Sequence, residues 1–249
     1  MVCRWWSSLQ DKDEKIILSR IFFILCALYL TLEARGYEPF LSFSASKSAL
    51  IKIYAEHKKL PISGCDYFFD PKGCSIAGIV DLKSCDYKIK NDPIMARQVQ
   101  WMHVLDPYHF GEEFSCLTKR ECRSSYSKKI YKGIRCCKQK SAKFKKMYAD
   151  MHNIIPVIGA FRKLRQGRYL KEARELEAEK GVVTPDDAKG TVARAYLYMI
   201  KTYDIKMPKR LKQMWLRWHK EHPVTSWEKK KKHLIFKLQD TSNWYIQAI

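Results

Sequence analysis

The sequence predicts an α+β fold in which short strands precede a helix-rich C-terminal third. Segments rich in β-branched and aromatic residues lie in the first half of the chain, and apolar residues recur at helical spacing from Pro185 onwards. Seven cysteines between Cys65 and Cys137 predict a domain stapled by disulfides. With 249 residues, of which 46% are hydrophobic, the chain has the size of one globular domain plus a targeting segment.

The N-terminus carries an apolar run, Ile21–Leu32, with Arg20 directly before it. The run is shorter than the ~20 residues of a membrane span, but it suits the core of a signal peptide. We therefore predict a signal peptide or signal anchor over residues 1–35 and one domain over residues 36–249, in an exported protein that is periplasmic or secreted. The alternative is an uncleaved membrane anchor that extends through Ile16–Leu18.

One helix and two strands are the first elements predicted after this segment. Ser44–Lys58 is expected to be helical, with Ser44 as its N-cap. The apolar run Ile76–Val80 predicts a strand, and so does Val99–Leu105, which is β-branched and aromatic on one face. The next segment, Gly111–Lys146, is basic and cysteine-rich, and it is expected to be loop-like.

Helices dominate the predicted C-terminal third. Pro185–Tyr203 opens with two aspartates and has an apolar face, and Pro208–His222 has a proline at the first-turn position. Tyr169–Lys180 also has a helical pattern, and Lys229–Lys232 is expected to be a solvated cationic face. The side chains of the second helix expected in the core are Leu211, Met214, Trp215 and Trp218.

The charge of the chain predicts polyanionic partners. Lys and Arg number 47 against 26 Asp and Glu, which gives a formal net charge of +21. Such a protein is expected to bind nucleic acid without sequence specificity, or in second place an anionic membrane surface. In Gly111–Lys146 basic residues interleave with tyrosines, which suits phosphate neutralisation and base stacking, although a solvated lid over the core is the alternative. The candidate nucleic-acid-binding residues are Lys128, Lys129, Lys132, Arg135, Lys138 and Lys140.

The cysteines agree with export. Cys3 and Cys26 lie in the targeting segment, and the other seven are expected to form disulfides. Because seven is odd, at least one of them is free, intermolecular or paired with a partner. A zinc site is the alternative, but the chain lacks paired CxxC spacing, and Cys136 and Cys137 are too close for a four-ligand knuckle.

Six stretches from Ser42 onwards, taken together and in order, carry a family resemblance. They are "SFSASKSALIKIYAEH" (Ser42–His57), "VDLKSCDYKI" (Val80–Ile89), "WMHVLDPYHFG" (Trp101–Gly111), "MYADMHNIIPVIG" (Met147–Gly159), "AKGTVARAYLYM" (Ala188–Met199) and "WHKEHPVTSWE" (Trp218–Glu228). They resemble the bacterial secreted endonuclease I family of non-specific nucleases. The resemblance implies a mixed α/β fold around a ββα-metal core.

The resemblance also implies a catalytic base. Hydrolysis of a phosphodiester needs a base that takes a proton from water and a positive centre for the charge that develops on the phosphate. The family's base is the His of a Trp-Glu-His-Val motif, and His103 occupies that place. The Glu before this His, and the first Asn of a later Gly-Glu-Val-Asn-Gly-Asp-Arg motif, hold one divalent ion in the family, typically magnesium.

This chain departs from the family at both metal ligands. Met102 stands in place of the Glu, and Gly159–Arg165 matches the later motif with Arg162 in place of the Asn. A thioether is a poor magnesium ligand and a guanidinium is a cation, so we expect no metal ligands here and weak or lost nuclease activity. Arg162, Arg165 and Arg120, which lies near the family's loop arginine, are the candidate phosphate stabilisers.

Three further positions match the family and are expected to support the site. Asp150, His152 and Asn153 would orient His103 or hold the backbone of the motif, and satisfying polar groups in the core is the alternative role.

Disulfide positions are implied by the resemblance as well. Cys65 with Cys85, and Cys116 with Cys122, sit where the family's disulfides lie. Cys136 and Cys137 fall in an expanded loop without a clear counterpart.

Three functions stay open at this point. The first is an exported pseudoenzyme that binds nucleic acid but cuts it poorly or not at all. The second is an active hydrolase in which His103 is the base and Arg162 or Arg165 replaces the ion, a mechanism easier for RNA because its 2′-hydroxyl is a built-in nucleophile. The third is a membrane-anchored basic interaction protein, which fractionation would separate from the others. A metal shifted to another position would use Asp106, His109 or Glu112.

Overall fold

The computed structural model describes residues 42–68, 78–85, 87–88, 93–165, 167–171 and 181–247. The chain divides into two units, Met1–Pro39 and Phe40–Ile249, and every described residue belongs to the second. The predicted targeting segment, Cys74 and residues 172–180 lie outside the described residues, so the export signal stays a prediction. No helix among the described residues is long and apolar enough to cross a membrane.

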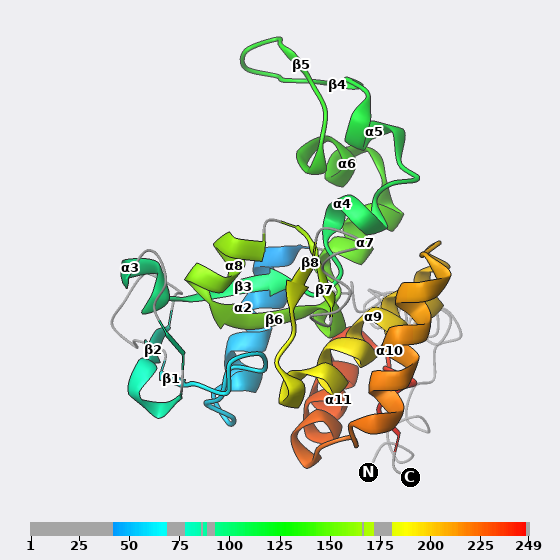
Figure 1. Ribbon diagram of the computed structural model, residues 1–249. Coiled ribbons are helices and arrows are strands. Elements are labelled where there is room, and N and C mark those ends of the chain that lie inside the picture. Colours follow the sequence, from blue (N-terminus) through cyan, green and yellow to red (C-terminus); the bar gives the residue numbers. More distant parts are fainter. Residues whose placement is uncertain are drawn as a thin grey trace, which may run out of the picture. The chain divides into compact units, whose positions relative to one another are not determined.

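The described unit combines helices with short two-stranded sheets, which confirms the predicted α+β class (Figure 1). Its first helix, α2 (Phe43–Tyr54), begins one residue before the predicted start at Ser44. Ser42 is the N-cap instead of Ser44, because its backbone is extended and its side chain accepts a hydrogen bond from the Ala45 amide at 3.1 Å. The helix also ends before the predicted end at Lys58.

A small antiparallel sheet follows this helix. It pairs β1 (Asp66–Phe68) with β2 (Ile79–Asp81), and the short helices η1 (Leu82–Ser84) and α3 (Pro93–Ala96) come next. β2 overlaps the end of the predicted strand Ile76–Val80, whose first two residues lie outside the described part of the chain.

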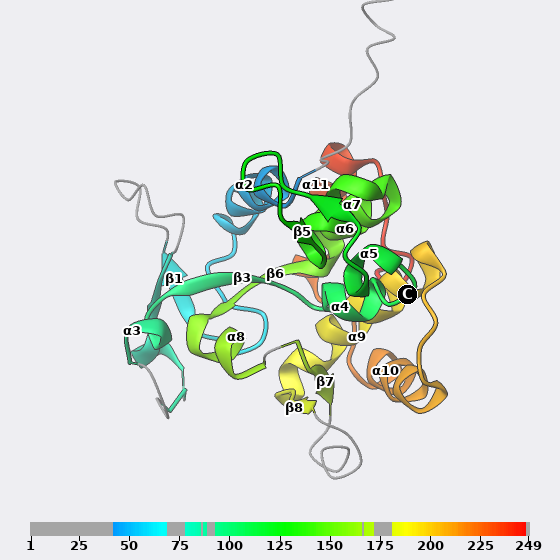
Figure 2. The ribbon, with the colours of Figure 1, turned by 90° about the horizontal axis from the view of Figure 1, so that it is seen from above.

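The central ladder joins β3 (Val99–His103) to β6 (Ile154–Ile158) in antiparallel register (Figures 1 and 2). All five residues of β6 are buried, as expected for a short apolar run in a core. β3 ends before the predicted end at Leu105. The Val104 amide still bonds the backbone carbonyl of Asn153 at 2.8 Å, but the Leu105 amide bonds the Asn153 side chain at 2.7 Å instead of a strand partner. Helix α8 (Gly159–Arg165) begins directly after β6.

The segment predicted to be loop-like, Gly111–Lys146, contains ordered elements, so that prediction was wrong. They are α5 (Ser115–Thr118), β4 (Cys122–Arg123), β5 (Ile130–Tyr131), α6 (Ile134–Lys140) and α7 (Ala142–Ala149), and α4 (Pro107–Phe110) precedes them. Disulfides hold α5, β4 and α6, and Ser141 caps α7 by accepting from the Phe144 amide at 3.1 Å, and neither feature is visible as apolar periodicity. We call Ser115–Lys140 the basic arm, and Figure 1 shows its β4–β5 hairpin extending beyond α6.

Two disulfides staple the basic arm. Cys116 pairs with Cys137 and Cys122 pairs with Cys136, with Cα–Cα distances of 5.2 and 5.6 Å. The implied pairing of Cys116 with Cys122 was therefore wrong. The pairing differs because α6 carries two adjacent cysteines, of which one faces α5 and the other faces β4.

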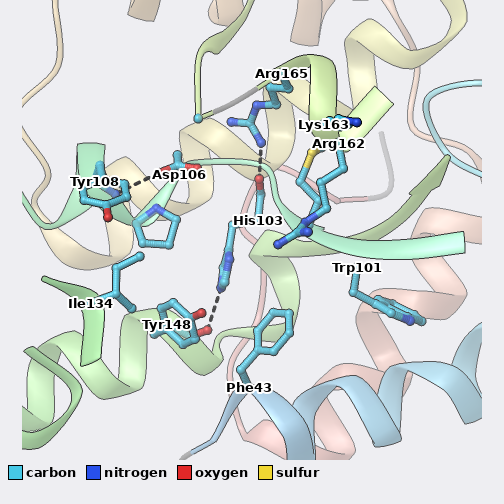
Figure 3. A pocket seen from close by; sticks show the side chains of 13 residues that line it. Phe43, Trp101, His103, Asp106, Tyr108, Ile134, Tyr148, Arg162, Lys163 and Arg165 are labelled. Atoms are coloured by element: carbon cyan, nitrogen blue, oxygen red, sulfur yellow. Dashed lines mark hydrogen bonds between the residues drawn. The ribbon is translucent and has the colours of Figure 1, made fainter. Parts of the chain in front are cut away.

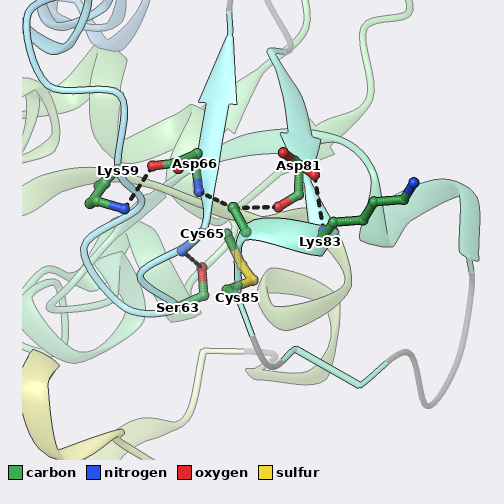
Figure 4. The surroundings of a disulfide bond; sticks show 8 residues. Lys59, Ser63, Cys65, Asp66, Asp81, Lys83 and Cys85 are labelled. Atoms are coloured by element: carbon green, nitrogen blue, oxygen red, sulfur yellow. Dashed lines mark hydrogen bonds and ion pairs between the residues drawn. A yellow bond between two sulfur atoms is a disulfide. The ribbon is translucent and has the colours of Figure 1, made fainter.

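The third disulfide is the one implied between Cys65 and Cys85. It ties the residue before β1 to the residue after η1, beside a network in which the Asp66 amide donates to Ser84 Oγ at 2.7 Å (Figure 4). All six described cysteines are thus paired, as expected for an exported chain.

The C-terminal part opens with a parallel pair of strands. Tyr169–Lys171 forms β7 and pairs with β8 (Gly181–Val183), so the helix predicted over Tyr169–Lys180 was wrong at its first residues. The helices that follow are η4 (Asp186–Ala188), α9 (Lys189–Tyr203), α10 (Lys209–Glu221) and α11 (Ser226–Gln239), which confirm the helix-rich C-terminal third. Pro208 is the N-cap of α10 instead of a first-turn residue.

The predicted core face of α10 is buried. Leu211, Met214, Trp215 and Trp218 are all at most 2% exposed, and Trp215 stacks on Tyr196 of α9 with ring centroids 3.9 Å apart. Figure 2 shows α10 at the edge of the described unit and α9 further inside it. α9 also contacts η2 (Met151–Asn153), the turn that joins α7 to β6, so the long helices support the central ladder.

Two basic side chains are buried near α11. Arg194 of α9 makes a bidentate ion pair with Glu228 at 2.7 Å, and the Lys231 ammonium lies 3.3 Å from the Tyr54 hydroxyl. Burial lowers the pKa of Lys231 to about 8. The prediction of a solvated face over Lys229–Lys232 was wrong for Lys231, whereas Lys229 and Lys230 are exposed.

Candidate functional site

A cavity of about 460 Å³ surrounds His103. Its wall is formed by strand β3, helix α8, the start of α2, the end of α7 and the first residue of α6 (Figure 3). The lining residues are Phe43, Trp101, Met102, His103, Asp106, Pro107, Tyr108, Ile134, Tyr148, Arg162, Lys163, Arg165 and Gly167. Three of the predicted site residues, His103, Arg162 and Arg165, thus share one cavity with Met102.

His103 is held in one tautomer by the backbone. Its Nε2 lies 2.8 Å from the carbonyl oxygen of Tyr148. Since a carbonyl oxygen only accepts, Nε2 carries the proton of the neutral ring and Nδ1 carries the lone pair. A side chain that is to accept a proton needs such a lone pair, so the geometry is suited to a base.

Burial lowers the pKa of His103 to about 4, and the positive charges of Arg165 and Arg162 act in the same direction. The folded pKa lies below the unfolded value, so His103 adds stability above about pH 6.5 that is lost as the pH falls to about 4.

We expect His103→Gln to reduce the acid-induced fall in the free energy of unfolding by about 3 kcal/mol. Urea unfolding of both proteins at neutral and acidic pH measures this difference. The control is His233→Gln, which makes the same substitution at an exposed histidine. A change in pH dependence for His103→Gln no larger than that for His233→Gln would contradict the prediction.

Arg162 and Met102 line the same cavity but differ in exposure. Arg162 is exposed on α8 and donates to the Gln100 side chain at 2.8 Å, which directs its guanidinium towards the rings of His103 and Phe43 (Figure 3). Met102 is only 5% exposed, and its side chain packs in the larger apolar core cluster. The cavity therefore receives a guanidinium and a thioether at the two positions that the resemblance singles out.

Arg165 has a different environment from Arg162. It is 1% exposed, and its guanidinium donates to the carbonyl oxygens of His103, Val104 and Arg168. These bonds join the end of α8 to the end of β3. Arg165 thus contacts the backbone of the candidate base, and its geometry is that of a positioning residue.

The three supporting residues form buried polar contacts. Asn153 clamps Leu105 by accepting from its amide and donating to its carbonyl, at 2.7 and 2.9 Å. His152 lies 3.1 Å from the Thr241 carbonyl, and burial lowers its pKa. Asp150 accepts from the side chains of two tyrosines and a glutamine and from the His152 amide. These contacts hold the segment between α7 and β6. Helix α7 carries the Tyr148 carbonyl that orients His103.

The predicted nucleic-acid-binding residues lie on the basic arm. Lys128, Lys129, Lys132, Arg135, Lys138 and Lys140 are all exposed. Lys138 connects the arm to the cavity, because its ammonium lies 4.9 Å from the centre of the Tyr148 ring. Arg120 is exposed on the same arm and does not line the described wall of the cavity.

The alternative metal position has other structural roles. Asp106 caps α4 by accepting from the Tyr108 amide at 3.0 Å, and His109 stacks on Tyr169 and bonds the Gly167 carbonyl at 2.9 Å. Glu112 is exposed and lines a different pocket from His103. Among the described residues, no group of three His, Cys, Asp or Glu side chains is placed to hold a metal ion.

Known proteins resemble this chain over most of its length. The Endonuclease-1 of Buchnera aphidicola subsp. Acyrthosiphon pisum is 30% identical over 220 residues, which cover 82% of this chain and 80% of the relative. The chain belongs to the endonuclease I family. The family model Endonuclease I also matches residues 170–249. A periplasmic deoxyribonuclease of Aeromonas hydrophila is 28% identical over a match that covers 83% of this chain and 85% of the relative. An extracellular deoxyribonuclease of the same organism is 27% identical over a match that covers 90% of this chain and 95% of the relative.

Several residues of this endonuclease I cavity were missed at the sequence level. Phe43, Tyr108, Ile134 and Lys163 line it, although none of them was a candidate. Tyr148 was not a candidate site residue, although it lies in the stretch Met147–Gly159 that carries the family resemblance, and its backbone carbonyl is the group that fixes His103. A backbone contact leaves no residue-type signal, so only the aromatic character of Phe43 and Tyr108 could have indicated a binding wall.

Proposed function

We propose that this endonuclease I family member is exported, binds nucleic acid at the His103 cavity and the basic arm, and has weak or no magnesium-dependent nuclease activity. The observation that carries the proposal is the pair Met102 and Arg162 in the wall of the cavity that holds His103. The base is retained, while both positions that would hold the ion carry side chains unsuited to it.

The chemistry of the cavity wall supports this proposal. Magnesium prefers oxygen ligands in near-octahedral geometry. Among the described lining residues, Asp106 is the one carboxylate, and its Oδ1 already accepts from the Tyr108 amide. Arg162, Lys163 and Arg165 bring three positive charges to the same wall, which disfavours a second cation and favours a phosphate. The residues do not fit a magnesium ion.

The basic arm supports nucleic acid as the ligand. A chain with a formal net charge of +21 attracts polyanions, and the exposed lysines of the arm reach the cavity at Tyr148 through Lys138. Relatives named periplasmic and extracellular deoxyribonuclease agree with this ligand and with export. The described β3–β6–α8 arrangement also agrees with a ββα core, in which α8 directly follows the second strand.

A second candidate function is metal-independent cleavage of RNA. It is favoured by His103, which is neutral at pH 7 and has its lone pair on Nδ1. This nitrogen would take the proton of the 2′-hydroxyl as the 2′-oxygen forms a bond to phosphorus. The bond from phosphorus to the 5′-oxygen would break, and the leaving oxygen would take a proton from water, while Arg162 stabilises the phosphate charge.

The test is incubation of the full chain with supercoiled plasmid and with structured RNA, in magnesium or in EDTA. We expect no cleavage of plasmid in either buffer and salt-sensitive binding of both nucleic acids. EDTA-resistant cleavage of RNA alone, lost in His103→Ala and kept in the exposed control His233→Ala, would establish the second candidate. Efficient plasmid cleavage that requires both magnesium and His103, and that goes to completion with catalytic amounts of protein, would overturn the proposal.

A further inference from the structure

The His103 cavity has the size of a site for one small organic molecule. Its volume of about 460 Å³ lies within the roughly 300–1,000 Å³ of typical ligand pockets. His103 lies inside it and is only 8% exposed. A base inside a duplex hides both faces in the stack and its edge in the pair, so it cannot enter such a cavity without leaving the helix.

One wall of the cavity is aromatic. The Phe43 and Tyr148 rings both contact His103, with centroids 5.0 and 4.6 Å from the imidazole, and 5.5 Å from each other. Both rings are half-buried, and the Tyr108 ring nearby is 58% exposed. Aromatic side chains that are partly open to solvent are the groups on which unpaired bases stack.

Another wall of the cavity is cationic. Arg162 and Lys163 are exposed residues of α8. Figure 3 shows the Arg162 guanidinium beside the His103 ring, while Phe43 and Tyr148 lie below that ring. The Gln100 side chain accepts a hydrogen bond from Arg162, which fixes the guanidinium beside the cavity. A planar guanidinium is a preferred partner of phosphate oxygens. The two walls together match the two chemical halves of a nucleotide.

We propose that this cavity binds one unpaired nucleotide, with its phosphate at Arg162 and its base against Phe43 and Tyr148, so that the chain prefers single-stranded nucleic acid to duplex. The inference rests on the proposed function, because both place nucleic acid in the same cavity. It goes further in naming the strandedness of the ligand. A single strand presents its bases without unpairing, whereas a duplex must first release one.

The experiment compares binding of a labelled unstructured single-stranded DNA and of a DNA hairpin with equal length, both in EDTA at one salt concentration. A non-nucleotide linker closes the hairpin, so that all its bases are paired. Equal numbers of phosphates match the electrostatic contribution. Wild type should bind the single strand more tightly. Phe43→Ala should weaken binding of the single strand about 5- to 150-fold, the range expected for one stacked base, and leave binding of the hairpin unchanged.

Two further variants separate stacking from folding. Phe43→Leu keeps an apolar side chain at the start of α2 but lacks a π face. This variant should therefore lose the preference for the single strand, while its melting temperature stays that of the wild type. Phe236→Ala removes a ring of α11 that is 47% exposed, and it should change neither affinity. Equal affinities of wild type for strand and hairpin, or equal losses on both in the Phe43 variants, would overturn the inference and leave the proposed function standing. Absence of binding to either DNA would overturn both.

Discussion

Met102→Glu combined with Arg162→Asn is expected to give this chain magnesium-dependent cleavage of plasmid DNA, at a rate at least about 100-fold above the wild type. The two changes restore two oxygen ligands of the type that the family resemblance implies, and they remove one positive charge from the cavity. His103 is already present as a base with its lone pair on Nδ1. The measurement is loss of supercoiled plasmid with time, in magnesium and in EDTA.

The placement of the two residues explains why both must change. Met102 directly precedes His103 on β3, and Arg162 lies in α8, which begins immediately after the partner strand β6. With Met102→Glu alone, the guanidinium of Arg162 would pair with the new carboxylate and exclude the ion. Each single change is therefore expected to stay near the wild-type rate.

The matched control is Met102→Gln with Arg162→Asn. Glutamine has the shape of glutamate but lacks its charge, so this variant should gain little activity in magnesium. Magnesium should also raise the melting temperature of the Glu–Asn variant and not that of the Gln–Asn variant, because only the former binds the ion. Equal activity of the two double variants would show that a carboxylate ligand is not what the wild type lacks.

Local patterns in the sequence predicted the parts of the site that depend on neighbouring residues. The β-branched and aromatic run from Val99 placed His103 on a strand, and helical spacing placed Trp215 and Trp218 in the core. Arg162 became a candidate site residue through the family resemblance, because no rule of sequence spacing links it to His103, which is distant in the chain. Both residues line one cavity because β3 pairs with β6 and α8 follows β6 without a loop.

Contacts between distant segments were not predictable in this way. Six described cysteines allow fifteen pairings, and the correct one depends on how α6 faces α5 and β4. Arg165 was a candidate for phosphate, yet its guanidinium donates to carbonyl groups at the end of β3. Lys231 belongs to a lysine run, but the turn of α11 directs it towards Tyr54. In each case tertiary placement decides the role, while the residue type alone suggests another.

Among single substitutions near the site, Asp150→Ala is expected to cause the largest loss of stability, about 3–5 kcal/mol in the free energy of unfolding. Asp150 is 1% exposed, and its carboxylate accepts from the Tyr198 and Tyr203 hydroxyls at 2.9 and 2.7 Å. It also accepts from the side-chain amide of Gln239 at 3.0 Å and from the backbone amide of His152 at 2.9 Å. Its removal leaves several buried donors without an acceptor, and each such donor costs about 1–3 kcal/mol before the surroundings relax. Urea unfolding at neutral pH measures the loss.

The control for this prediction is Asp81→Ala, which removes a carboxylate that caps η1 in the same way as Asp150 caps η2. Asp81 accepts from the Lys83 amide at 2.9 Å but is partly exposed, so its removal should cost only about 1 kcal/mol. The difference between the two variants isolates the buried contacts to α9 and α11 from the capping bond that both share. Similar losses in the two variants would mean that water replaces the carboxylate of Asp150. A larger loss for Asp150→Ala, together with weaker nucleic-acid binding, would tie the position of His103 to this buried acceptor, because the residues that Asp150 anchors closely follow the Tyr148 carbonyl.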